Sequence, residues 1–149
     1  MPEVLAKSPA FVLSSYIIEE LELMTDPVDD ADWPLFSSHL PDGINSCGCM
    51  YDTTGIRDGR VMSTGEMVEH HGIQLTIRAA EYEAGRAKAE EIALALDATY
   101  NGSISIESGV DFELQNVKRM SSVVALGLEI DSKRNYLFTV DFLVTLRQV

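Results

Sequence analysis

The residues of this chain most able to carry chemistry are its three histidines, because imidazole binds metals and transfers protons near neutral pH. Two of them stand together in Glu69-His70-His71, and the third is His39. Neighbouring residues of an extended chain point to opposite faces, so His70 and His71 cannot easily share a metal ion. The sequence also has no HExxH or HxxxH spacing. We interpret the three as solvated loop histidines. The alternative is a small metal-dependent or nucleotide-processing enzyme whose fold gathers them with Glu69.

The two cysteines, Cys47 and Cys49, lie in the run NSCGCMYD. Side chains at positions i and i+2 of a strand point the same way, but a bridge between them would close a strained small ring. A metal site would need two further ligands nearby. We therefore expect the pair to remain as reduced thiols.

Other catalytic and cofactor motifs are absent from the sequence. It contains no GxGxxG or GxxxxGK[ST] phosphate loop and no GxSxG elbow. Asp26, Asp29, Asp30 and Asp32 resemble a calcium loop only superficially, because the glycine and the closing glutamate are missing. We predict no catalytic residue, no bound metal and no cofactor, and we do not expect the chain to be an enzyme.

The net charge of −13 limits the possible partners. The first 42 residues hold nine acids and one base, a net charge of −8, and the remaining residues carry −5. A chain this acidic repels phosphate, so it could surround DNA but would not grip it. Solubility alone would also explain the charge. The basic residues are scattered and form no stripe with aromatic residues.

Length and composition indicate a single domain over residues 1–149 with one core. No apolar run is long enough to span a membrane. The first residues, MPEVLAKSPAF, lack the basic start and apolar centre of a signal peptide. We therefore expect the chain to fold in the cytoplasm.

The elements that would position these residues begin with a helix over residues 9–25. Ser8 supplies an N-cap hydroxyl, Pro9 suits the first helical turn, and Pro27 would end the helix. The connection over 26–43 contains large apolar side chains, which must either pack under the loop or meet a neighbouring subunit. They are Trp33, Leu35, Phe36 and Leu40.

A first strand is predicted over residues 44–52, followed by a glycine-rich connection over residues 53–71. Connections of this length are uncommon and often functional. The same segment could instead be an extended hairpin arm with Arg60, Met62 and Met67 near its tip or flanks.

A second strand then runs directly into a second helix. Apolar residues alternate at Ile73, Leu75 and Ile77, and spacings of three and four begin at Tyr82 and continue to Leu96. The change of period predicts one strand face packed against one helix face.

Two further strands are predicted near the C-terminus. A strand near residues 112–117 breaks at residues 118–121 and continues over 123–130, and residues 136–147 form the last strand. Residues 103–107 could add a short extra strand. The even-numbered residues from Phe138 to Leu146 are uniformly apolar, so that face of the last strand should meet the helices.

The predicted fold class is α+β, in the order α-β-β-α-β-β. Runs of strands joined by turns indicate a mostly antiparallel, four-stranded sheet with both helices packed on one face and a long loop between the first two strands.

Parts of this pattern resemble a known family. The unit GIQLTIRAAEYEAGRAKAEEIALALD, the Asn-Gly turn after it and the closing strands ending YLFTVDFLVTLRQ resemble the tail-terminator, or tail-completion, proteins of long-tailed bacteriophages. The segment MSSVVALGLEIDSKRNYLFTVDFLV is similar to that family's closing hairpin, with a polar turn before an aromatic strand. The similarity covers nearly the whole chain.

The resemblance implies a structural virion protein that forms a ring, usually of six subunits, at the head-proximal end of the tail tube. Such a ring ends tube polymerisation and offers a docking face for the head. The implied partners are further copies of the chain, the tail tube protein and a head–tail connector or stopper protein. Genomic DNA passes through the channel without specific binding, assembly takes place in the host cytoplasm, and no membrane is involved. A head-side connector or minor capsid protein of the same virion is the nearest alternative.

Two groups of residues are candidates for these contacts. The first group, expected to face the tail tube or the channel, is Arg57, Arg60, Met62, Glu66, Met67 and His70. The second group, expected at the interface between subunits, is Trp33, Phe36, Arg78 and Arg86.

Overall fold

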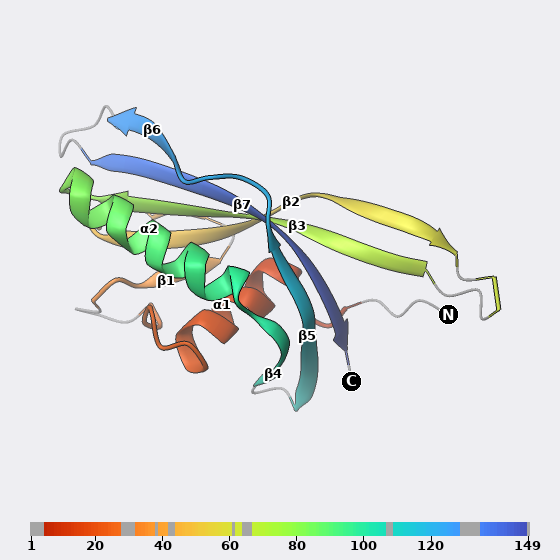
Figure 1. Ribbon diagram of the computed structural model, residues 1–149. Coiled ribbons are helices and arrows are strands. Elements are labelled where there is room, and N and C mark those ends of the chain that lie inside the picture. The colour runs from red at the N-terminus through yellow and green to blue at the C-terminus, as the bar shows by residue number, and fades with distance from the viewer. Residues whose placement is uncertain are drawn as a thin grey trace.

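The computed structural model describes residues 5–27, 32–37, 39–41, 44–60, 62–63, 67–106, 109–128 and 135–148. Its elements are α1 (Pro9–Glu19), β1 (Leu35–Ser37), β2 (Cys47–Arg60), β3 (Met67–Ala79), α2 (Tyr82–Asp97), β4 (Tyr100–Ile106), β5 (Val110–Arg119), β6 (Val124–Leu128) and β7 (Tyr136–Gln148). The strands form one curled sheet in the order β1-β2-β3-β7-β5-β4, and β6 also pairs with β7 (Figure 1). Among the described strand pairs, only β1 and β2 run parallel.

The predicted fold class, α+β with a four-stranded sheet, is therefore wrong, because the described part of the chain is mostly β, with 53% strand and 22% helix, and forms a mixed sheet of seven strands. The three-residue strand β1 is too short to show a period in the sequence. The break predicted at residues 118–121 lies at residues 120–123, and it separates two strands, β5 and β6, that the prediction counted as one. The long loop expected between the first two strands is also wrong, since β2 and β3 both continue through it and pair there.

Strand β7 lies at the centre of the sheet. One edge pairs with β3, from His71 opposite Val144 to Ala79 opposite Tyr136. The other edge pairs with β5 over its C-terminal half and with β6 over its N-terminal half. Its even-numbered side chains are buried, as the alternating pattern predicted: Phe138, Val140, Phe142, Val144 and Leu146. Together with apolar residues of both helices they form one core cluster.

Helix α1 starts where the sequence predicted and ends earlier. The Ser8 hydroxyl accepts a hydrogen bond from the N–H of Phe11 at 3.2 Å, and Pro9 occupies the first turn. The predicted end near residue 25 is wrong, because the helix stops at Glu19 and Glu22 adopts a φ of 54°. This left-handed residue turns the chain so that Met24 becomes buried.

Helix α2 packs closely on the sheet through Gly85. A Cβ added to Gly85 would lie 2.7 Å from the Cβ of Ala79 and 2.7 Å from the ring of Phe138. One turn earlier, Tyr82 meets Phe138 edge-on with 5.1 Å between ring centroids. The glycine therefore lets a helix backbone approach that any larger residue would prevent.

Residues from 39–41 and 44–46 lie against the opposite face of the sheet. Arg78 projects from β3 on this face and is only 4% exposed. Its guanidinium donates hydrogen bonds to the carbonyl oxygens of Pro41 and Ile44. Across the described residues, no helix is both long and apolar enough to cross a membrane.

The close approach at Gly85 leads to a stability prediction. We expect Gly85→Leu to lower the free energy of unfolding by about 1–3 kcal/mol or more, because the added side chain overfills the space between α2 and β7. The control is Ala84→Leu, one residue earlier on the exposed side of α2, which should change it by less than about 0.5 kcal/mol. Chemical denaturation would measure both, and equal midpoints would contradict the packing argument.

Candidate functional site

The most prominent feature outside the core is an arm made by the distal halves of β2 and β3 (Figure 1). Every residue of β2 from Asp52 to Arg60 is exposed. Eight residues of strand, from Thr53 to Arg60, extend about 25 Å. The segment expected as a loop or a hairpin arm thus takes the second form. We define the arm as residues 53–60 and 67–71, together with their connection.

Two glycines shape the base of the arm. The β2–β3 register shifts between Thr53 and Ile56, which marks a bulge. At this bulge, a Cβ on Gly55 would lie 2.2 Å from the carbonyl oxygen of His70, and a Cβ on Gly72 would lie 2.4 Å from that of Thr54. Both obstacles are backbone atoms, which cannot move aside as a flexible side chain would. The two strands can therefore approach this closely at the bulge only because neither residue has a side chain.

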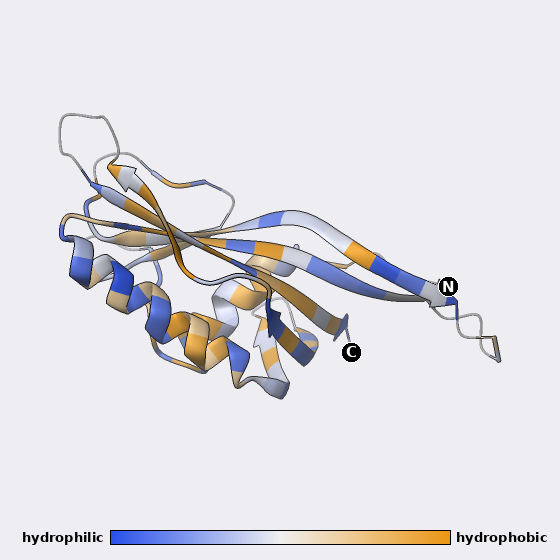
Figure 2. Cartoon of the chain, turned by 45° about the horizontal axis from the view of Figure 1, so that its top comes forward, coloured by the Kyte–Doolittle hydropathy of each residue, from blue (hydrophilic) through white to orange (hydrophobic). Residues whose placement is uncertain are grey.

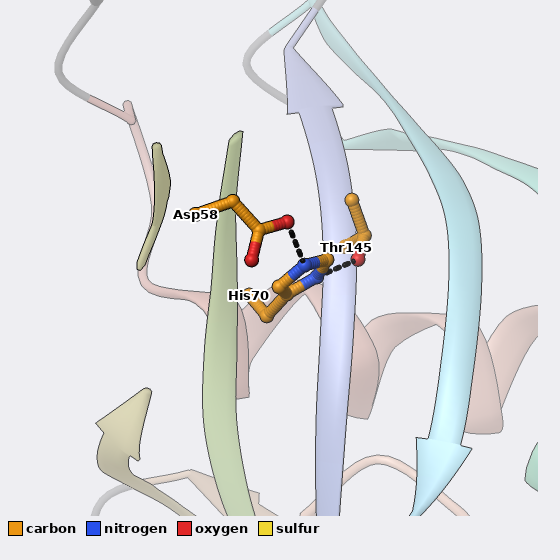
Figure 3. A network of polar contacts seen from close by, with 3 residues as sticks. All are labelled: Asp58, His70 and Thr145. Atoms are coloured by element: carbon orange, nitrogen blue, oxygen red, sulfur yellow. Dashed lines mark hydrogen bonds and ion pairs between the residues drawn. The ribbon is translucent and has the colours of Figure 1, made fainter. Parts of the chain in front are cut away.

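His70 links the arm to the rest of the sheet (Figure 3). Its Nδ1 lies 2.6 Å from the Thr145 hydroxyl on β7, and its Nε2 lies 2.9 Å from an Asp58 carboxylate oxygen on β2. The pairing of β3 with β7 ends at the next residue, His71. The imidazole of His70 on β3 therefore contacts β7 at the point where β3 and β7 separate. Sequence reasoning selected His70 but missed its two partners. Asp58 is on a stretch of β2 with both faces in water, which leaves no periodic signal, and the period of β7 places Thr145 on the polar face without indicating a partner.

The other arm residues predicted to make contacts lie near its outer end. Arg57 and Glu69 are opposite each other and form an exposed ion pair at 3.7 Å. Arg60 is exposed at the end of β2, opposite Met67, the first residue of β3. Met62 is fully exposed. Glu66 lies outside the described residues. Isolated exposed ion pairs contribute little stability, so the side chains of Arg57 and Glu69 are available to other partners.

The four residues predicted for a subunit interface do not form one group. Trp33 has a φ of 52° and is half-buried. The ammonium of Lys88 on α2 lies over the Trp33 ring, 5.7 Å from the ring centroid. Phe36 is half-buried on β1, where its ring is 6.5 Å from that of His39. Arg86 is exposed on α2, whereas Arg78 is buried within the chain as described above. Trp33 therefore packs within its own chain, one of the two outcomes expected for the large residues of this segment.

His70 and His71 point to opposite sides of the sheet, as the extended chain predicted. His71 lines a shallow pocket of about 140 Å³ with Pro9 and Asp52 on the side of α1, whereas His70 contacts Thr145 on the other side. In the described ranges, no group of three or more histidine, cysteine or acidic side chains is arranged to hold a metal ion.

The cysteines are buried and unbridged on the face opposite the helices. Burial raises the pKa of the Cys49 thiol, and a hydrogen bond from Tyr51 opposes this only in part. Burial is also the largest cause that raises the pKa of Tyr51 to about 12, and its contact with Cys49 adds to the shift. Both groups therefore keep their protons at neutral pH, which does not favour a nucleophilic thiol.

Comparison with known families decides what kind of protein carries this arm. The family model described as "Bacteriophage tail terminator protein" matches residues 17–148, nearly the whole chain. The chain belongs to this family. It is thus a structural protein of the phage tail, a component that interacts with other tail or head proteins. A search of curated proteins finds no match.

Membership of the tail terminator family confirms the resemblance seen in the sequence. The matched range includes β2, β3 and their arm, as well as α2 and the closing strands β5 to β7. Candidate functions for the arm are therefore contacts within a virion.

The base of the arm can be tested with two glycines. We expect Gly72→Ala to lower the free energy of unfolding by about 1–3 kcal/mol, because the new methyl group collides with backbone at the bulge. Gly59→Ala, further along the same arm, is the control, since a Cβ there meets nothing within 4 Å. Thermal unfolding would report the global effect, and hydrogen exchange of the arm amides the local one. A Gly72→Ala protein matching Gly59→Ala in both would show that the bulge tolerates a side chain.

The raised pKa of Tyr51 predicts how stability changes in alkaline solution. Above pH 10 the unfolded chain releases the phenol proton while the folded chain retains it, so stability should fall as the pH rises from about 10 to about 12. Tyr51→Phe should reduce this loss. Tyr100→Phe, at a residue that is 74% exposed, is the control and should keep the wild-type slope. Urea unfolding at several pH values would measure how the free energy of unfolding changes with pH. Equal slopes in the two variants would contradict the assignment of this loss of stability to Tyr51.

Proposed function

We propose that copies of this chain assemble into a closed ring of six subunits at the head-proximal end of the phage tail tube. The ring ends tube polymerisation and provides the docking surface for the head connector or stopper protein. The whole chain, residues 1–149, acts as one domain in this assembly, which forms in the host cytoplasm. Family membership supports the structural role, and the exposed arm carries the proposal further because it offers each subunit a long contact outside its own core.

The arm is assigned to the tail tube or to the channel. A two-stranded hairpin with both faces in water is only marginally stable by itself, so it gains most when another protein covers it. Extended strands bind partners through backbone hydrogen bonds as well as side chains. The residues proposed for this contact are Arg57, Arg60, Met62, Glu66, Met67 and His70.

The acidic charge fits a channel through which DNA passes without being bound. With a net charge of −13 on each copy, a ring would repel phosphate along its inner wall. The contacts between subunits are proposed to involve Phe36, Arg86 and the part of Trp33 that its own chain leaves exposed, with the buried Arg78 supporting the segment beside them. A heterologous contact of this kind closes into a ring when the rotation between neighbours closes.

Removal of the outer arm tests the proposal. Deleting residues 57–67 joins Ile56 to Val68 but keeps the Ile56–His70 pair, so two residues close the hairpin, as in the commonest tight turns. We expect a protein that folds but fails to end tails, which would then vary in length and exceed the wild-type length. Electron microscopy of tails would measure the lengths.

Gly59→Ala serves as the control for an altered but intact arm, and circular dichroism would verify that the deletion protein is folded. Tails of normal and uniform length with the folded deletion protein would refute the role of the arm. Defective heads together with normal tails would instead favour a head-side connector.

A further inference from the structure

One half of the sheet is a row of five strands with β6 at one end and β1 at the other. Leu35 pairs with Gly48, Gly48 with Ile77, Ile77 with Phe138, and Phe138 with Ala125. Strands β5 and β4 lie along the other half of β7. The two ends of this row are different surfaces on opposite sides of the same subunit (Figure 1).

The β6 end is apolar, and the described part of the chain leaves it uncovered. All five residues of β6 are exposed, including Val124 at 46%, Leu126 at 59% and Leu128 at 45%. No residue from 120 to 128 is charged, although the chain as a whole is strongly acidic. In Figure 2 this apolar strand extends along β7, away from α2. Edge strands of monomeric proteins are normally protected by charges or prolines, so an unprotected one indicates a surface that becomes buried in an assembly.

The β1 end offers a matching depression. A groove of about 200 Å³ lies between β1, α1 and the turn at Asp26–Pro27, and its apolar lining comes from Phe11, Ile18, Leu35 and Phe36. The N–H of Leu35 already donates to the carbonyl oxygen of Thr25 at 3.0 Å. A strand arriving here would therefore be held mainly by its side chains in the groove.

We propose that β6 of one copy docks into the β1–α1 groove of the next copy, with Leu126 as its central apolar contact. The proposal rests on the ring suggested above and names the surfaces that would form it. A second copy is the occupant that the charges favour, because copies with a net charge of −13 repel each other least where few charges meet: β6 carries none, and the groove is lined by one acid, Asp26. Since the two surfaces lie at opposite ends of one row of strands, the contact is head-to-tail and can continue from copy to copy until a ring closes.

Three single substitutions test the contact. Leu126→Glu on β6 and Ile18→Glu in the groove should each reduce the assembled species to a single copy of 16.4 kDa. Leu94→Glu, at an equally exposed leucine on α2 (63%), is the control and should leave the assembly intact. Light scattering would give the mass in solution, and amine cross-linking followed by electrophoresis would give it on isolated tails. Circular dichroism would establish that each variant is folded.

Mixing the two defective variants identifies the geometry. The Ile18→Glu protein keeps an intact β6, and the Leu126→Glu protein keeps an intact groove, so an equal mixture should form a dimer that cannot grow. A contact between two copies of β6 would instead leave Ile18→Glu fully assembled, and that result would overturn the head-to-tail proposal.

The controls separate this inference from the ring itself. If the wild-type protein forms an assembly that Leu126→Glu does not alter, the β6 contact is wrong and the ring remains. If the wild-type protein is a single copy both in solution and on tails, the ring is wrong and the contact is overturned with it.

Discussion

The separation of β3 from β7 is the constraint on which the rest of the structure depends. The two strands pair without a break from Ala79–Tyr136 to His71–Val144 and then diverge. Beyond this point β3 stays with β2 and forms the arm, whereas β7 stays with β5 and remains part of the curled sheet. The separation of these two strands thus divides the molecule into a buried core and a solvent-exposed arm.

Helix α1 and the residues just before it lie beside this point of separation and contact both β2 and β7. The N–H of Ala10 donates to the Asp52 carboxylate on β2 at 3.0 Å, and the N–H of Ala6 donates to the Gln148 side chain on β7 at 2.8 Å. Further along, Tyr16 lies against Gly102 of β4, where an added Cβ would be 3.0 Å from the phenol oxygen. The curl of the sheet toward α1 closes the core on the β7 side, so only the β2–β3 branch extends into solvent.

The distribution of apolar surface agrees with a protein whose work is assembly. Its core uses the inward faces of β3 and β7 and the two helices, yet β6 carries apolar side chains that nothing in the described part of the chain covers. The arm carries polar and charged residues on both faces, and its β2 residues contribute nothing to the core. Apolar edges and extended arms can hold neighbours together without any bound cofactor, which suits a structural component of the tail.

The sequence alone determined the elements that have one solvent-exposed face and one buried face. The even-numbered residues of β7 and the stripe of α2 could be predicted because burial imposes a period on them. The start of α1 could be predicted because Ser8 and Pro9 suit the cap and first turn of a helix. The arm, the early end of α1 at the left-handed Glu22 and the burial of Arg78 leave no such period. Tertiary structure decided them, because they depend on which strands become neighbours, on the backbone contacts of Gly55 and Gly72, and on a covering segment supplied from elsewhere in the chain.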